Sequence, residues 1–333
     1  MPSNRDFANS RRAIETAVAF CEARDAVLIV SDNSRDAEKA AYWQGRSPVL
    51  HYIPEAPIAA TDNQLSALGA ARTPFLLQIG DDDEIFSNPE VVPVDLGALG
   101  DDYIGVKPVT EMFLPGMGPV RRQEFGLEKD DPGLRLRDYL AYSDGSNVAY
   151  YSIFRTAPFM DLTRFFLSRH PTRGGFCDWQ LAFAFWVIGK LKSDPSIIYR
   201  YNASQWSTEE VVRESALKSY LAAGLTAEFQ KYKSLIRGLD FYVFISRKNA
   251  GLTAEAITKL QNGEASDLID LGLDQILRMP DGTPDTGLAL ARKARGERNA
   301  SVKYLSGCAV LEQFVPGLQL KYVSFLKAAI SGT

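Results

Sequence analysis

The fold of this 333-residue chain is decided by the stretch Pro74-Phe75-Leu76-Leu77-Gln78-Ile79-Gly80-Asp81-Asp82-Asp83-Glu84. Its first part, residues 74–79, is an apolar run bounded by turn residues, which predicts a buried parallel strand. Four acidic side chains follow at the carboxyl end, where open α/β sheets bind their ligands. Carboxylates this close repel one another in a partly dry cleft, and a divalent cation relieves that repulsion. The alternative is a solvated acidic loop. The segments before residue 74 help to decide between a cation-binding site and such a loop.

Helix and strand patterns alternate through the residues before this stretch. In chain order they are a helix at 9–22, a strand at 26–30, a helix at 37–44, a strand at 49–53 and a helix at 62–71. Asp62 is expected to cap the last of these helices. Parallel strands end at a shared edge of the sheet, so Asp32, which follows the strand at 26–30, should lie close to the acidic cluster. The sequence therefore predicts an α/β fold with its polar site at that edge.

Composition excludes several classes of protein. Hydrophobic residues make up 46% of the chain, which is enough for a large core, and the net charge of −4 argues against a general nucleic-acid binder. Cys21, Cys177 and Cys308 lack any Cys-x-x-Cys spacing, so neither a disulfide framework nor a zinc site is indicated. No apolar run is long enough to span a bilayer, and the polar Asn4-Arg5-Asp6 does not suit a signal peptide. These features predict a cytoplasmic protein.

Three short segments carry a resemblance to a known family. They are Pro2-Ser3-Asn4-Arg5, Val30-Ser31-Asp32-Asn33-Ser34 and Leu77-Gln78-Ile79-Gly80-Asp81-Asp82-Asp83-Glu84, and the helical segment with Asp62-Asn63-Gln64 sits between the second and third. In order and spacing they resemble an inverting glycosyltransferase of the large family 2, with the GT-A fold. The match covers roughly residues 2–205, and the Gly-Asp-Asp-Asp variant is similar to that of enzymes building bacterial polysaccharides. The resemblance implies a Rossmann-like sheet sandwiched by helices.

The resemblance also implies a nucleotide-diphosphate sugar as donor and a glycan or lipid-linked acceptor. Asp83 and Asp81, the two ends of an Asp-x-Asp motif, would hold Mn²⁺ or Mg²⁺, both of which favour oxygen ligands. The donor would be bound by residues from all of the matching segments: Pro2, Ser3, Asn4, Arg5, Asp32, Asn63, Asp81 and Asp82.

One departure from the family concerns its first strand. Members begin with an apolar strand immediately before the turn that resembles Pro2 to Arg5, whereas this sequence starts at the turn. An absent interior strand leaves its two neighbours with unpaired backbone groups. We therefore expect either a gap in the sheet or a substitute strand. A full interior strand within residues 1–8 would mean that this match is out of register.

The second predicted site is Gly174-Gly175-Phe176-Cys177-Asp178-Trp179-Gln180, which precedes an almost wholly apolar helix. It resembles the family's Gly-Phe-x-x-Asp segment, whose acidic residue is the catalytic base, and a base is needed to take the proton of the acceptor hydroxyl. The competing role for Asp178 is an N-cap of that helix. Trp179 stacks on a sugar or belongs to the core, and Ser146 and Asn147 line the pocket or serve as turn residues. Should Asp178 be only a cap, the alternative bases are Glu84, Asp144 and His170, although a surface loop is expected at His170.

Helical patterns dominate from residue 206 onward, so we divide the chain into a transferase domain at 1–205 and a helical region at 206–333 that contributes to acceptor, partner or oligomer contacts. A basic cluster lies there beside apolar side chains. Such a cluster is typical of a solvated helix face, of a surface that contacts the inner face of the membrane, or of a contact with a second subunit. It comprises Arg292, Lys293, Arg295, Arg298 and Lys303, next to Phe314, Val315, Tyr322 and Phe325. Two rival functions remain: a non-catalytic glycan-binding scaffold, and a sugar nucleotidyltransferase, which needs a Gly-rich phosphate loop that does not appear.

Overall fold

A computed structural model describes residues 1–54, 59–172, 178–206, 208–222, 224–278 and 284–332. The chain forms two compact units. The first contains residues 1–128, 141–160 and 190–208, and the second contains residues 129–140, 161–189 and 209–333. This division differs from the predicted 1–205 and 206–333 because residues 129–140 and 161–189 pack with the C-terminal helices.

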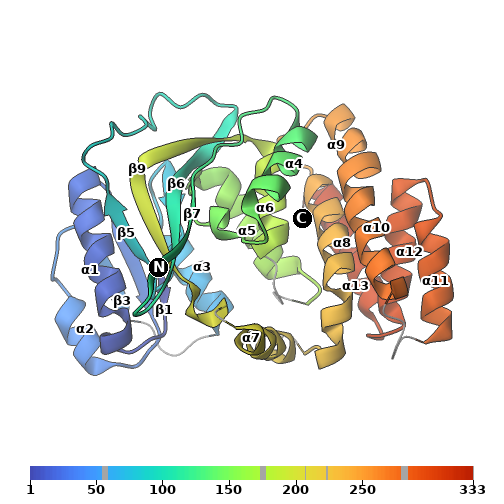
Figure 1. The fold of residues 1–333 in the computed structure, drawn as a ribbon, viewed down its shortest axis with the longest axis horizontal. Coiled ribbons are helices and arrows are strands. Elements are labelled where there is room, and N and C mark those ends of the chain that lie inside the picture. The colour runs from blue at the N-terminus through green and yellow to red at the C-terminus, as the bar shows by residue number, and fades with distance from the viewer. Residues whose placement is uncertain (55–58, 173–177, 207, 223, 279–283, 333) are drawn as a thin grey trace. The chain divides into compact units, whose positions relative to one another are not determined.

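The first unit begins with the alternation that the sequence predicts (Figure 1). A three-stranded parallel sheet has the order β1-β2-β3, with Pro2 beside Ser31 and Leu28 beside Leu50. The elements are β1 (Pro2–Ser3), α1 (Phe7–Arg24), β2 (Leu28–Asp32), α2 (Ala37–Trp43), β3 (Leu50–Pro54), α3 (Ala60–Ala70) and β4 (Phe75–Leu77). The strand β1 has two residues, so the described residues 1–8 contain no full interior strand.

A second, mixed sheet of six strands completes the first unit. Its order is β4-β8-β6-β9-β5, and β7 pairs with β6. The prediction of a buried parallel strand at 74–79 is wrong, because β4 is shorter, is half-buried, and pairs antiparallel with β8 in this second sheet. The remaining strands are β5 (Glu84–Ser87), β6 (Tyr103–Leu114), β7 (Gly118–Gln123), β8 (Ile153–Arg155) and β9 (Lys190–Asn202). The Gly- and Pro-rich residues 115–119 form the turn of the β6–β7 hairpin and the start of β7. A 3₁₀ turn, η1 (Val148–Tyr150), precedes β8.

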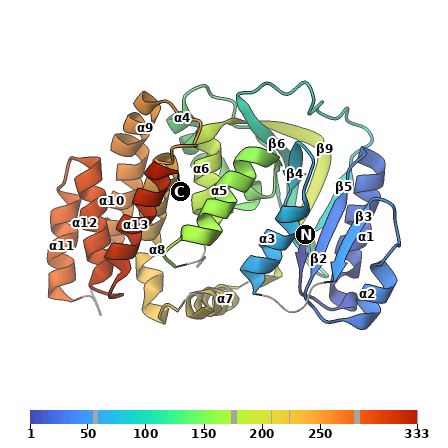
Figure 2. The ribbon, with the colours of Figure 1, turned by 180° about the vertical axis from the view of Figure 1, so that it is seen from behind.

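Helices cover both faces of the parallel strands, with α1 and α3 on opposite sides in both views (Figures 1 and 2). The core between them includes Ile14 of α1 and Val30 of β2, both fully buried. Asp6 caps α1 by accepting a hydrogen bond from the backbone N–H of Asn9 at 2.9 Å. The expected cap at Asp62 is wrong, because α3 begins two residues earlier, with Ala59 at the N-cap position and Asp62 inside the first turn.

The second unit is helical, as predicted for the C-terminal region, and its earlier helices are α4 (Pro132–Ser143), most of which lies in this unit, α5 (Thr156–Arg169) and α6 (Asp178–Ile188). It continues through α7 (Glu209–Ala222), α8 (Lys233–Ile245), α9 (Ala254–Leu260), α10 (Ser266–Arg278), α11 (Asp285–Arg295), α12 (Ala300–Glu312) and α13 (Leu318–Ser331). α12 and α13 are separate helices, since Pro316 cannot continue a helix and Gly317 adopts a φ of 85°. The predicted α/β sheet flanked by helices, with a helical C-terminal region, is confirmed.

The basic cluster of the second unit does not form one surface with its apolar neighbours. Tyr322 and Phe325 are buried in the core. Lys303 is buried as well and pairs with Asp270 at 2.7 Å, and the same carboxylate also binds Arg295. These contacts are those of a packed helical unit. Among the described residues, no helix combines the length and the apolar character needed to cross a membrane.

Candidate functional site

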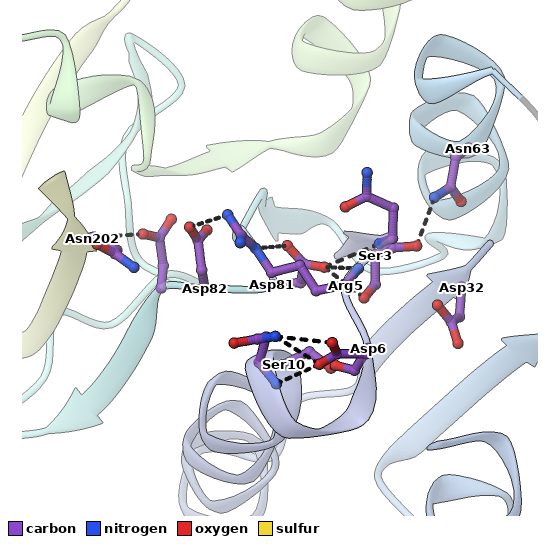
Figure 3. A network of polar contacts seen from close by, with 12 residues as sticks. Ser3, Arg5, Asp6, Ser10, Asp32, Asn63, Asp81, Asp82 and Asn202 are labelled. Atoms are coloured by element: carbon purple, nitrogen blue, oxygen red, sulfur yellow. Dashed lines mark hydrogen bonds and ion pairs between the residues drawn. The ribbon is translucent and has the colours of Figure 1, made fainter. Parts of the chain in front are cut away.

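Asp81 is the centre of the polar site in the first unit, and the turn after β1 holds it (Figure 3). Its Oδ2 accepts hydrogen bonds from Ser3 Oγ at 2.8 Å and from the backbone N–H groups of Asn4 and Arg5, both at 3.0 Å. Arg5 Nε donates to Oδ1 at 3.2 Å. Charge-assisted hydrogen bonds of this kind are the strong ones. The structure thus joins two of the segments that carry the family resemblance through one carboxylate.

The guanidinium of Arg5 spans two of the three acidic residues. While Nε contacts Asp81, Nη2 donates to Oδ2 of Asp82 at 2.5 Å. Burial is the main cause that raises the pKa of Asp82, and the charge of Arg5 opposes it. Gly80 lets the loop fold back on itself, because a Cβ there would lie 2.7 Å from Oδ2 of Asp83. The geometry of the loop at 80–83 therefore depends on the guanidinium of Arg5 and on Gly80.

A buried lysine connects Asp32 to the same turn. Lys39, on α2, donates to Oδ1 of Asp32 at 3.0 Å, to Ser3 Oγ at 2.6 Å and to the carbonyl oxygen of Arg5 at 2.8 Å. Its side chain is fully buried. The hydroxyl of Tyr52 donates to the other oxygen of Asp32. Asp32 and Asp81 are therefore linked through Ser3, as expected, although the strands before them, β2 and β4, belong to different sheets.

Asn63 reaches the turn from α3 on the other face of the sheet. Its Nδ2 donates to the carbonyl oxygen of Ser3 at 3.1 Å (Figure 3). The side chain is 2% exposed, and its Oδ1 has no hydrogen-bond partner among the described residues. A buried acceptor without a donor is costly unless a ligand or water supplies one. Asn63 Oδ1 is thus a buried, unsatisfied acceptor beside the turn.

Asp83 has different surroundings from Asp81. The hydroxyl of Tyr199 donates to its Oδ2 at 2.5 Å, and the backbone N–H of Asn202 donates to Oδ1 at 2.8 Å. Both donors are neutral, and the carboxylate is 2% exposed. Burial raises the pKa of Asp83 to about 7, against the lowering effect of these two hydrogen bonds. Asp83 is therefore a buried carboxylate whose charge no cation compensates in any ion pair found among the described residues.

The donor set suits a hard divalent cation only in part. No group of three or more His, Cys, Asp or Glu side chains converges on a metal position among the described residues. Mg²⁺, however, is usually bound by one or two carboxylates together with substrate phosphates and water. Asp83 fits that requirement, because a cation would offset the burial that raises its pKa. Asp81 fits it less well, since both of its oxygens already accept hydrogen bonds from Ser3 to Arg5.

The predicted base, Asp178, lies in the second unit as the first residue of α6. Residues 174–177 of its motif lie outside the described residues. Burial lowers the pKa of two cations of α8, that of Arg237 and that of Lys233, the latter to about 8. The negative charge of Asp178 opposes this lowering at both residues. The role as general base stays a prediction.

Trp179, predicted to stack on a sugar or to belong to the core, is half-buried beside Asp178. Its ring lies 6.0 Å from that of Tyr139 and 5.9 Å from that of Phe183, and the guanidinium carbon of Arg237 lies 5.0 Å from its centroid. The indole ring is thus part of an aromatic cluster with one cation over it.

Ser146 and Asn147 belong to another part of the first unit, the turn after α4. Ser146 Oγ accepts from the backbone N–H of Val148 at 3.4 Å, and the carbonyl oxygen of Asn147 accepts from that of Tyr150 at 2.9 Å. Both side chains are 9% exposed. These hydrogen bonds are turn chemistry, and a pocket role for either residue stays a prediction.

The three alternative bases occupy separate places. Glu84 begins β5, and its Oε1 lies 3.5 Å from Nε of Arg12. Asp144 is an exposed turn residue with a φ of 44°. The expectation of a surface loop at His170 is wrong. Its ring is 4% exposed, and Nε2 lies 3.0 Å from Oδ1 of the buried Asp240. None of these three residues begins a helix, as Asp178 does at the start of α6.

Three residues of the site were not predicted from the sequence: Lys39, Tyr52 and Tyr199. Lys39 sits three residues after the cap of α2, where a lysine is normally solvated, and nothing local distinguishes it. Tyr199 follows the alternation of β9, which signals that it faces the core but not which residue it contacts. Both act through partners that are distant in sequence.

Comparison with known proteins adds little to this description. No family model and no curated protein matches the chain. Among solved structures, the chain is similar to S. aureus TarS at 13% identity and a TM-score of 0.39, covering 99% of this chain and 54% of that one. It is also similar to TarS 1–349 (13% identity, TM-score 0.40, 98% and 88%) and to TarS 1–349 in complex with UDP-GlcNAc (14%, 0.39, 98% and 89%). The chain spans about half of the longer TarS chain. Because these TM-scores lie below 0.5, we draw nothing about function from the likeness.

Proposed function

We propose that the protein is an inverting glycosyltransferase that moves a sugar from a nucleoside-diphosphate donor to an acceptor hydroxyl. The observation that supports this proposal most directly is the acidic loop of Asp81 to Asp83, fixed to the Ser3–Arg5 turn at the edge that also carries Asp32. One carboxylate of the loop, Asp83, is buried without a compensating cation. Such a site suits a ligand that arrives together with a divalent metal, as a nucleoside diphosphate does.

Each side chain of the site has a distinct role in this proposal. Asp32 and Asn63 flank the turn on the nucleoside side of the proposed site, where a nucleoside would share the oxygens of Asp32 with Lys39 and Tyr52. Asp81 keeps the turn and the loop together, which fixes the position of its neighbours. Asp83 is the residue that would hold Mn²⁺ or Mg²⁺, with Asp81 as the second candidate. When bound, the cation neutralises charge on the departing diphosphate.

The acceptor half of the reaction needs a base. We propose that Asp178 takes the proton of the acceptor hydroxyl as that oxygen forms its bond to the anomeric carbon and the bond to the diphosphate breaks. The charge of Asp178 acts on the cations Arg237 and Lys233 of α8, which lie on the helix packed against α6. The acceptor proposed from the family resemblance is a glycan or a lipid-linked glycan in bacterial polysaccharide synthesis.

The test of the function is a turnover assay with a panel of nucleotide sugars, Mn²⁺ and glycan acceptors. Metal-dependent release of the nucleoside diphosphate with sugar transfer is the expected result. Binding without turnover for every donor would favour a scaffold, and formation of pyrophosphate from a nucleoside triphosphate and a sugar phosphate would favour a nucleotidyltransferase.

The base is tested by Asp178→Asn, which keeps the size of the side chain but cannot accept the proton. We expect the transfer rate to fall by about 10²- to 10⁴-fold, with donor affinity nearly unchanged. Glu255→Gln is the matched control, because Glu255 is an exposed acid in the first turn of α9 in the same unit, and it should leave the rate unaltered. An Asn variant that retains most of its turnover would show that Asp178 only stabilises the start of α6.

A further inference from the structure

A buried carboxylate lies inside the helical second unit. Asp240, on α8, is 0% exposed, and α8 packs against both α6 and α13. Among the ion pairs of the described residues, none joins Asp240 to a lysine or an arginine. A buried ionised group is costly unless hydrogen-bond donors satisfy it. Asp240 therefore depends on the side chains that surround it.

Three side chains from three other parts of this unit contact the carboxylate. Nε2 of Gln180, in the first turn of α6, donates to Oδ2 at 3.1 Å, and the hydroxyl of Tyr322, on α13, donates to Oδ1 at 2.9 Å. Nε2 of His170, just after α5, lies 3.0 Å from Oδ1, although the ring is not aligned for a hydrogen bond. All four side chains are 4% exposed or less. Both oxygens of Asp240 thus have protein partners in a network closed to solvent.

The ring of His170 is fixed in its orientation. Its Nδ1 accepts a hydrogen bond from the backbone N–H of Thr172 at 3.3 Å. A ring nitrogen that accepts carries no proton, so the proton of the neutral ring is on Nε2, the nitrogen beside Asp240. The ring centroids of Phe166 and Phe325 lie 4.7 Å and 5.4 Å from that of His170. These contacts hold the polar N–H of the ring towards the carboxylate.

Two of these contacts flank Asp178 in the sequence. His170 precedes Asp178, and Gln180 follows it in the same first turn of α6. One carboxylate on another helix therefore holds the chain on both sides of the proposed base. A base acts only when it lies within hydrogen-bond reach of the proton that it takes, and a displacement of about 1 Å can cost about 10²-fold in rate. The position of Asp178 thus depends on contacts that lie outside the reacting groups.

We propose that Asp240 is a positioning residue, which fixes the first turn of α6, and with it Asp178, through Gln180 on one side and His170 on the other. This inference rests on the proposed function, in which Asp178 is the base. A network that only stabilised the fold would have the same contacts. The two roles differ in one measurable respect: if the network acts through Asp178, breaking it has no further effect on the rate once Asp178 cannot take the proton.

The test is a double-mutant cycle with Gln180→Leu and Asp178→Asn, using the nucleotide sugar that turns over in the donor panel. Gln180→Leu removes the hydrogen bond between α6 and Asp240. Alone, it should lower kcat by about tenfold and leave the KM of the donor within about twofold, because the base is displaced while the donor site is intact. In the Asp178→Asn background it should change the rate by less than about twofold.

Gln261→Leu is the matched control for the loss of an amide hydrogen bond. Gln261 is half-buried in the same unit and donates to Ser246 Oγ at 2.9 Å, so its loss leaves the partners of Asp240 in place. This control should leave kcat unchanged. If Gln180→Leu folds poorly, Gln180→Met takes its place, because its side chain has the native length, and the same pattern is expected.

Amide hydrogen exchange tests the same anchor without turnover. Within α6, the N–H of Ala182 pairs with the carbonyl oxygen of Asp178, so its exchange reports on the first turn. Gln180→Leu should speed this exchange by about tenfold and leave that of the buried Leu273, on α10, within about twofold.

The outcomes separate the network from the proposed function. Equal rate losses from Gln180→Leu in the two backgrounds would overturn the positioning role and leave Asp240 as a stabiliser of the fold. Wild-type kcat together with wild-type exchange at Ala182 would overturn it as well. Failure of the proposed function has a different signature, because Asp178→Asn would then keep its turnover, or no donor would react, while exchange at Ala182 still responded. That result would confine Asp240 to holding the start of α6.

Discussion

Asp81 and Asp83 are two residues apart on one loop, yet their surroundings differ. Asp81 accepts hydrogen bonds from the turn after β1, including one from the guanidinium of Arg5. Asp83 accepts from neutral donors, among them Tyr199 and the backbone N–H of Asn202, and forms no ion pair among the described residues. The first carboxylate is compensated by the protein itself. The second lacks such compensation, and burial raises its pKa to about 7.

This difference separates a structural carboxylate from one prepared for a ligand. A carboxylate held by a cation and several N–H groups stabilises the fold, whereas a buried carboxylate without a cation weakens it when ionised. A fold keeps the second kind where another charge arrives later. The contrast leads us to assign the organising role to Asp81 and the cation-binding role to Asp83.

The largest effect on stability is expected for Asp81→Ala. The substitution leaves Arg5, Ser3 and two backbone N–H groups without their acceptor, and breaking a buried pair by removing one partner is costly. We expect a loss of about 3 kcal/mol in the free energy of unfolding, at the low end for such pairs because Arg5 is one-third exposed. Urea denaturation measures it. Asp101→Ala, at a fully exposed side chain, should change little, and equal losses in the two variants would refute the organising role.

The pH dependence of stability should reveal Asp83. Its pKa is about 7 in the folded protein and 3.8 as the reference value, so the folded state holds a proton that the unfolded state has lost. This contribution stabilises the protein below pH 4 and is lost as the pH rises towards 7. Relative to Asp83→Asn, which does not titrate, wild-type stability should fall by about 2 kcal/mol from pH 4.5 to pH 6. Parallel curves for the two proteins in urea titrations would contradict the raised pKa.

A smaller effect is expected for Tyr199→Phe. The variant removes one of the neutral donors to Asp83 and leaves the ring in place. At pH 8, where Asp83 is ionised, the loss of this buried hydrogen bond should cost about 1 kcal/mol. Tyr103→Phe is the control, because the hydroxyl of Tyr103 donates to Glu128 at the surface. If the control lost as much stability, the Tyr199 hydroxyl would have no special relation to the site.

Local patterns predicted the elements of the site and the approach of Asp32 to the acidic loop. The predicted reason, neighbouring parallel strands of one sheet, is wrong, because β2 and β4 belong to different sheets and Ser3 and Lys39 make the link. The contacts that distinguish Asp81 from Asp83 could not be predicted from local sequence patterns. Arg5 and Tyr199 reach the loop from 76 and 116 residues away. The same holds for His170, which was expected on the surface because its buried partner, Asp240, lies in a helix 70 residues later.

The most direct test of the account is a calorimetric titration of a nucleoside diphosphate into wild type, with and without Mn²⁺, and into Asp83→Asn with Mn²⁺. A neutral amide cannot compensate a cation, so we expect metal-dependent binding to wild type and at least a tenfold weaker affinity in the variant, about 1.4 kcal/mol. The change should occur while the variant unfolds at the same or a higher urea concentration than wild type at pH 7. Equal, metal-dependent affinities in the two proteins would contradict the assignment of Asp83 as the residue that holds the cation.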